Sequence, residues 1–101
     1  MADPHSVALL VKDEKQIRRL VRRVLEDQGW IVQEAETVAR GLSEASARIL
    51  DLIILDLGLP DGDGIDFLRE FRGWSDVAVI VVSGRVSERD KIEALDAGAD
   101  D

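Results

Sequence analysis

Residues 52–57 read Leu52-Ile53-Ile54-Leu55-Asp56-Leu57, four aliphatic residues of strand character followed by a carboxylate. Glycine and proline crowd the next eight positions and prevent the strand from continuing. An uninterrupted apolar run of this kind is typical of a strand covered by helices on both faces of a parallel sheet. Ligands of open α/β sheets bind in the crevice at the carboxyl ends of the strands. We therefore expect Asp56 at the mouth of such a crevice, although an aspartate that only caps a turn has the same sequence pattern.

The length and charge of the chain limit its function. With 101 residues it has the size of one small domain. Its net charge of −8 argues against direct binding to nucleic acid or to an anionic membrane, and suits a divalent cation or a basic partner surface. The sequence has no cysteine, no apolar run of membrane-spanning length and no signal-peptide pattern in residues 1–6, so we expect a cytoplasmic protein. The single histidine, His5, lies outside any predicted element and is expected in solvent.

Short apolar runs and helical stripes alternate along the chain. Strands are predicted at residues 7–11, 30–34, 52–57 and 77–82, and helices after the first strand up to Gly29, at 38–47, at 65–72 and from Ser87 to Gly98. Thr37 is the expected N-cap of the second helix, and Ser87-Glu88-Arg89-Asp90 is close to a capping box. This βαβαβαβα order predicts an α/β fold, a doubly wound parallel sheet with right-handed crossovers.

Each helix has an apolar side. In the first helix it is one stripe of Ile17, Leu20, Val21, Val24 and Leu25. The expected inner residues of the others are Val38, Leu42 and Ala45 in the second helix, Leu68 and Phe71 in the third, and Ile92 and Leu95 in the last. The other side of the first helix carries Arg18, Arg19, Arg22 and Arg23. These arginines either form a solvated face or contact a partner protein.

Polar side chains follow three of the predicted strands. Asp13 comes after the first, Asp56 after the third and Ser83 after the fourth. Because neighbouring parallel strands lie about 5 Å apart, these strand ends should converge. Two carboxylates and a loop carbonyl form an all-oxygen site of the kind that Mg²⁺ accepts, and a carboxylate can also act as a nucleophile in aspartyl-phosphate chemistry. The hydroxyl of Ser83 could donate to a phosphoryl group on Asp56.

Three segments together resemble the receiver domain of bacterial two-component response regulators. They read Leu-Val-Lys-Asp-Glu at 10–14, Ile-Ile-Leu-Asp-Leu-Gly-Leu-Pro-Asp-Gly-Asp-Gly at 53–64 and Ala-Leu-Asp-Ala-Gly-Ala-Asp-Asp at 94–101. The resemblance implies a flavodoxin-like fold in which Asp56 accepts a phosphoryl group from a sensor histidine kinase. It also implies that Mg²⁺ is bound by Asp13, Asp56 and the backbone carbonyl of Gly58, and that Ser83 is the switch hydroxyl that follows the phosphoryl group.

The chain departs from the family pattern in two places. Lys12 stands where receivers usually carry the first member of an acidic pair, so its charge should repel and partly replace Mg²⁺ unless its flexible side chain points into solvent. The series of elements stops at Asp101, before the family's fifth strand and fifth helix. We therefore expect residues 1–101 to form a C-terminally truncated receiver domain with strand order 2-1-3-4. Its run Val77–Val82 would be an unpaired edge open to self-association, and Ile17, Leu20 and Val24 would be uncovered.

The resemblance implies a phosphoacceptor domain that controls an output, for which transcription is expected. It is no enzyme beyond promoting its own phosphorylation and dephosphorylation. Within the family the amino-acid sequence most resembles the response regulators of potassium-transport systems. The alternative is a truncated or pseudo-receiver interaction module in which Lys12 and the missing segment impair phosphorylation. A free-standing hydrolase with Asp56 as its nucleophile is also open, but the sequence offers no general acid or base for it.

Overall fold

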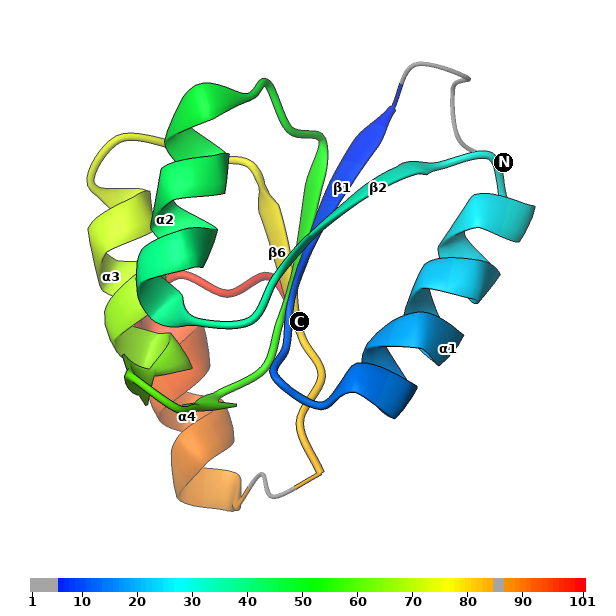
Figure 1. Ribbon diagram of the computed structural model, residues 1–101. Coiled ribbons are helices and arrows are strands. Elements are labelled where there is room, and N and C mark those ends of the chain that lie inside the picture. Colours follow the sequence, from blue (N-terminus) through cyan, green and yellow to red (C-terminus); the bar gives the residue numbers. More distant parts are fainter. Residues whose placement is uncertain (1–5, 85–86) are drawn as a thin grey trace.

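The computed structural model describes residues 6–84 and 87–101, so His5 lies outside the described residues. Four strands form one parallel sheet in the order β2-β1-β3-β6 (Figure 1). Their bounds are Val7–Val11 for β1, Ile31–Ala35 for β2, Leu52–Leu55 for β3 and Ala78–Val81 for β6. Since β6 is the fourth strand of the sequence prediction, the predicted α/β class and the strand order 2-1-3-4 are confirmed.

The helices cover the two faces of the sheet unequally (Figure 1). Helix α1 (Lys15–Asp27) lies on one face, and α2 (Val38–Ala47), α3 (Gly64–Arg72) and α4 (Glu88–Asp96) lie on the other. The predicted caps are present, because Thr37 accepts from the N–H of Arg40 and Ser87 forms a capping box with Asp90. None of the helices in the described ranges has the length and apolar character needed to cross a bilayer.

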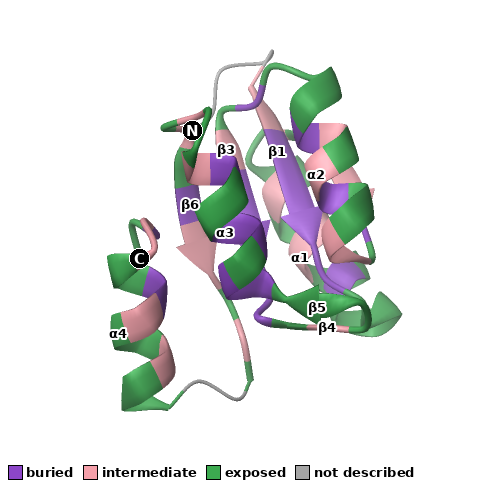
Figure 2. Ribbon diagram, turned by 90° about the vertical axis from the view of Figure 1, so that its left-hand side faces the viewer, coloured by how far each residue is buried: buried purple, intermediate pink, exposed green. Residues whose placement is uncertain are grey.

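Two apolar clusters form the core, one on each face of the sheet. The larger one packs beneath the three helices and includes Leu9, Val11, Ile53, Leu55, Phe67, Leu68, Phe71, Val79 and Ala94. The smaller one consists of Leu10, Val32 and Ile54, with Val21 and Leu25 of α1 packed against them. Neighbouring residues of β1 and β3 therefore point to opposite faces and are buried on both, as the uninterrupted apolar runs predict (Figure 2).

The apolar stripe of α1 is only partly used. Val21 and Leu25 pack on the sheet, whereas Ile17, Leu20 and Val24 are 37%, 61% and 56% exposed. The prediction that these three are uncovered is confirmed. Within the described residues, α1 is alone on its face of the sheet, so the side of the helix that turns away from β1 and β2 has no neighbour.

The predicted inner face of the last helix is wrong. Ile92 and Leu95 of α4 are 59% and 53% exposed, and Ala94 is the buried residue. Small residues make the contacts here, because Ala94 of α4 and Ala99 after it belong to the larger core cluster, and Ala97, the C-cap, packs against it. Alanine carries little weight in a periodicity argument, so the larger Ile92 and Leu95 dominated the prediction.

The prediction that the outer edge of β6 is unpaired is wrong. The N–H of Val79 donates to the carboxylate of Asp100 at 2.8 Å, and the N–H of Asp100 donates to the carbonyl of Val79 at 2.9 Å. The N–H of Val81 donates to the carbonyl of Asp101 at 2.8 Å. Residues 100–101 therefore lie along this edge and satisfy part of its backbone groups.

Candidate functional site

Asp56 directly follows β3 and is only 7% exposed. Its N–H donates to the carbonyl of Val11 at 2.9 Å, which extends the pairing of β3 with β1 by one residue. Its Oδ1 accepts a hydrogen bond of 3.3 Å from the N–H of Gly58. A hydrogen bond to β1 therefore fixes the backbone of Asp56, and the chain leaves the sheet after this residue. The carboxylate lies at the carboxyl edge of the strands.

Lys12 follows β1 and reaches the same carboxylate. Its N–H donates to the carbonyl of Ala35 in β2, and its Nζ lies 3.0 Å from Oδ2 of Asp56. Both side chains are about nine-tenths buried, with exposed fractions of 11% and 9%. The alternative in which Lys12 points into solvent is therefore wrong. A buried ion pair contributes little net stability, but removal of one partner leaves an uncompensated charge.

The predicted site residues meet in one open cavity of about 550 Å³. Its lining includes Lys12, Asp13, Asp56, Gly58 and Ser83, together with Glu14, Asp63 and Asp90, which sequence reasoning did not select. In the described ranges, no group of three or more acidic or histidine side chains is placed to hold a metal ion. The ligand set predicted from the sequence has two carboxylates, Asp13 and Asp56, and the backbone carbonyl of Gly58.

The loop after Asp56 is more ordered than its glycine content suggests. Residues Gly58–Leu59 (β4) and Gly62–Asp63 (β5) pair as a small antiparallel hairpin, which the sequence analysis did not predict. The side chain of Asp63 then accepts from the N–H of Ile65 and caps α3. A Cβ atom on Gly64 would lie 2.4 Å from the carbonyl oxygen of Asp56, so only glycine allows this close approach.

Asp61, at the tip of this hairpin, ties the loop to a second helix. Its carboxylate accepts hydrogen bonds from the N–H groups of Val38 and Ala39 at 2.7 and 3.0 Å. These bonds lower the pKa of Asp61 below its ordinary value. The loop that carries Gly58 is therefore held between the N-termini of α2 and α3.

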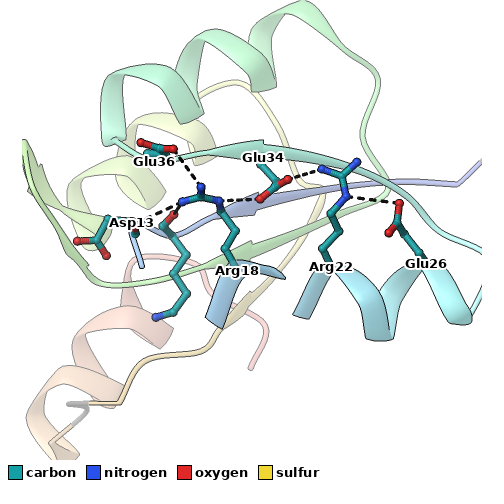
Figure 3. Close-up of polar contacts among 7 residues, drawn as sticks. Asp13, Arg18, Arg22, Glu26, Glu34 and Glu36 are labelled. Carbon is teal, nitrogen blue, oxygen red and sulfur yellow. Dashed lines mark hydrogen bonds and ion pairs between the residues drawn. The ribbon is translucent and has the colours of Figure 1, made fainter. Parts of the chain in front are cut away.

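A network of arginines and glutamates joins α1 to β2 beside the site (Figure 3). Arg18 is 8% exposed and its guanidinium contacts Glu34, Glu36 and the backbone carbonyls of Lys12 and Asp13. The hypothesis of a solvated arginine face is therefore wrong for Arg18, whereas Arg19 and Arg23 are exposed.

Glu34 lies at the centre of this network. Arg18 donates to its Oε1 from Nε at 2.6 Å, and Nη1 of Arg22 donates to its Oε2. Burial raises the pKa of Glu34, but the hydrogen bonds from Arg22 and Arg18 outweigh it, and the pKa lies below its ordinary value. The carboxylate of Glu34 is therefore held in its ionised form. A signal for this network exists in the sequence, because Glu34 in β2 and Glu36 directly after β2 are two residues apart, the spacing that puts side chains on one face of a strand.

The comparison with known families agrees with this arrangement of strands and carboxylates. A family model described as the response regulator receiver domain matches residues 8–101. The chain belongs to this family. Response regulators act in two-component signalling, and their receiver domains typically use Mg²⁺ and interact with sensor histidine kinases.

Two curated relatives carry the same regulatory name. The chain is 64% identical to the KDP operon transcriptional regulatory protein KdpE of Escherichia coli over 93 residues, which cover 92% of this chain and 41% of that protein. It is 48% identical to the transcriptional regulatory protein KdpE of Mycobacterium tuberculosis over 96 residues, which cover 95% of this chain and 42% of that protein. The chain thus spans about two fifths of the length of these relatives, and within the family it is most like KdpE.

Solved structures agree on the fold. The receiver domain protein (CheY-like) of Methanospirillum hungatei has a TM-score of 0.89 and 29% identity, and the match covers 95% of this chain and 78% of that one. A response regulator of Burkholderia pseudomallei has a TM-score of 0.89 and 25% identity, over 94% of this chain and 56% of that one. Its structure contains a phosphorylated aspartic acid, a calcium ion and citrate.

Proposed function

We propose that this chain is the receiver domain of a KdpE-like response regulator and accepts a phosphoryl group on Asp56 from a sensor histidine kinase. A carboxylate oxygen of Asp56 attacks phosphorus, the P–N bond to the kinase histidine breaks, and an acyl phosphate forms as the histidine nitrogen takes a proton. The observation that carries the proposal is the position of Asp56, buried at a strand end with its carboxylate on an open cavity. The phosphorylated aspartic acid in the Burkholderia relative supports it.

The other predicted site residues have matching roles in this proposal. Asp13, Asp56 and the backbone carbonyl of Gly58 would hold Mg²⁺, which neutralises charge on the transferring phosphoryl group when bound. The oxygen-only donor set fits this ion, and each oxygen of Asp56 keeps a lone pair because Lys12 and Gly58 supply one hydrogen bond each. Ser83, which lines the same cavity, would donate its hydroxyl to the phosphoryl group.

Lys12 modifies this site. Its ammonium group is already paired with Oδ2 of Asp56, so it competes with a divalent cation for that carboxylate and repels the cation electrostatically. We propose that Mg²⁺ affinity is consequently weakened. The same charge also offsets the negative charge of a phosphoryl group on Asp56, so Lys12 partly replaces the ion.

The output of the domain follows from its relatives. Since the named relatives are transcriptional regulators of which this chain matches about two fifths, we propose that phosphorylation of Asp56 controls transcription. The Escherichia coli relative is named for the KDP operon, and the potassium-transport genes that the sequence resemblance implies are the first candidates. The proposed kinase partner and output place the domain in the cytoplasm. The chain would also promote its own phosphorylation from small phosphodonors, as well as the hydrolysis of its acyl phosphate.

Self-association through the edge of β6 stays a prediction. Because Asp100 and Asp101 occupy part of this edge, a second chain could pair there only after residues 100–101 are displaced.

The experiment that tests the proposal is labelling with acetyl phosphate, followed by mass spectrometry of the intact chain. The parent should gain one phosphoryl group, and Asp56→Asn should gain none because an amide is not a nucleophile here. Asp66→Asn is the matched control, since Asp66 is acidic, nearby in sequence and largely exposed. Labelling that persists in Asp56→Asn contradicts the assignment of the acceptor. A parent chain that takes no label favours the interaction-module alternative.

A further inference from the structure

Arg18 connects the acidic face of β2 to the loop that carries Lys12 and Asp13. Its Nη1 donates to the carbonyl of Lys12 at 3.0 Å and to the carbonyl of Asp13 at 3.3 Å. Its Nε donates to Glu34 at 2.6 Å and its Nη2 donates to Glu36 at 3.0 Å. All three guanidinium nitrogens of this buried side chain are therefore engaged (Figure 3).

These contacts hold the backbone of Lys12 from two directions. Its N–H donates to the carbonyl of Ala35, and its carbonyl accepts from Arg18. Fixing both groups fixes the direction in which the side chain leaves the strand end, and Nζ of Lys12 then reaches Asp56. Asp13 is the next residue and lines the same cavity, so its position depends on the same backbone.

The charge of Arg18 is balanced so that the guanidinium can stay buried beside the loop. Glu34 and Glu36 supply two carboxylates for it, and a buried guanidinium without them would be costly. The planar fork of arginine allows one side chain to bind two carboxylates and two carbonyls together, which a lysine ammonium on its single flexible stem matches poorly.

Arg22 provides an internal comparison. It is on the same helix and pairs with the same Glu34, but its other contact is Glu26 and it makes no contact with the loop among the described hydrogen bonds. Removing Arg22 therefore removes an ion pair to β2 without releasing the backbone of Lys12.

We infer that Arg18 is a positioning residue of the phosphoacceptor site, which acts by fixing the Lys12–Asp13 backbone so that Lys12 reaches Asp56 and Asp13 lines the same cavity. This inference rests on the proposed role of Asp56 as the acceptor. It makes the Glu34–Glu36 pair a remote part of the site, since these carboxylates orient Arg18 and touch none of the predicted reacting groups.

The test compares Arg18→Met, Arg18→Lys and Arg22→Met by the rate constant of acetyl-phosphate labelling, corrected for the folded fraction of each variant. Small displacements of reacting groups slow a reaction strongly. We therefore expect the labelling rate constant to fall about tenfold in Arg18→Met and less than about twofold in Arg22→Met. Arg18→Lys, which keeps the charge and guards against a failure of Arg18→Met to fold, should not restore the rate. Equal rates in Arg18→Met and Arg22→Met overturn the inference.

A second measurement separates this inference from the proposed function. Hydrogen exchange of the Lys12 amide, read by NMR, should accelerate in both Arg18 variants and keep the parent protection in Arg22→Met. If the parent takes no label, the proposed function fails, and the exchange rate alone decides the inference. Unchanged protection of Lys12 in the Arg18 variants then contradicts it.

Discussion

The ammonium of Lys12 lies 3.0 Å from Oδ2 of Asp56, and both groups are about nine-tenths buried. The two residues follow the neighbouring strands β1 and β3, whose pairing places Val11 opposite Leu55. The ion pair is therefore a direct product of the sheet register. It gives the carboxylate of Asp56, the proposed acceptor, a fixed positive neighbour before any ion or phosphoryl group arrives.

Replacing Lys12 by glutamate should strengthen Mg²⁺ binding. Lys12→Glu removes the competing ammonium and adds a carboxylate at the same strand end, so we expect affinity to rise at least about tenfold, which is roughly 1.4 kcal/mol. Titration calorimetry on the full chain measures this. Lys15→Glu is the control, because it changes the net charge equally at an exposed position at the start of α1. Equal Mg²⁺ affinities of the parent and Lys12→Glu would contradict the proposed role of Lys12.

The glycine at the start of α3 should be sensitive to a single methyl group. In Gly64→Ala the new Cβ would meet the carbonyl oxygen of Asp56 at 2.4 Å, so the backbone at Asp56 must shift. We expect a loss of unfolding free energy of about 1–3 kcal/mol and slower labelling of Asp56. Gly58→Ala is the matched control, since a Cβ there meets nothing within 4 Å. Urea unfolding of the two variants measures the difference. A Gly64→Ala variant as stable as Gly58→Ala would contradict the steric conflict between a Cβ at Gly64 and the carbonyl oxygen of Asp56.

Much of the fold was predictable because the central strands β1 and β3 are buried on both faces. Continuous apolar runs such as Leu52–Leu55 and punctuation by Gly29 and Gly98, both with positive φ, are strong local signals. The convergence of Lys12, Asp13, Asp56, Gly58 and Ser83 at one edge then follows from the parallel order of the strands. The roles of these residues come from the family resemblance and are still proposals.

What could not be predicted depends on long-range contacts between polar groups. The direction of Lys12 depends on the hydrogen bond that its N–H donates to the carbonyl of Ala35 and on the one that its carbonyl accepts from the side chain of Arg18. Ala35 is distant in sequence, and Arg18 was assigned to the polar side of the helix. The pairing of Asp100 with Val79 is a tertiary contact that leaves no periodic signal. The inner face of α4 was missed because alanine, not the larger Ile92, makes the contact.

Glu34 should make stability depend on pH in the acidic range. Its pKa is lowered in the folded state, so the ionised form stabilises the fold fully above the ordinary glutamate pKa of about 4.3, and this contribution is lost as pH falls through the lower folded value. The difference in unfolding free energy between the parent and Glu34→Gln should be constant from about pH 7 to pH 5 and shrink below about pH 4.

Urea titrations at a series of pH values measure this difference. Glu70→Gln serves as the control, because Glu70 is exposed on α3, and its difference from the parent should be small throughout. A Glu34→Gln difference that is unchanged down to pH 3 would show that the arginine contacts do not favour the ionised carboxylate.

Asp100 should govern whether the edge of β6 is open to another chain. Its Oδ2 accepts from the N–H of Val79 at 2.8 Å and from Nη2 of Arg72 at 3.0 Å. In Asp100→Ala both donors lose this acceptor. The free energy of unfolding should fall by about 1–3 kcal/mol, and residues 100–101 should be held less tightly.

The strand edge that is then freed belongs to the run Val77–Val82. This run has no charge and no proline, and such edges pair readily with other strands. We therefore expect Asp100→Ala to sediment as larger species than the parent at equal micromolar concentration. Asp100→Asn keeps a carbonyl acceptor for Val79 and should behave more like the parent. If Asp100→Ala and the parent sediment alike, the hydrogen bonds of residues 100–101 are not what limits association through this edge.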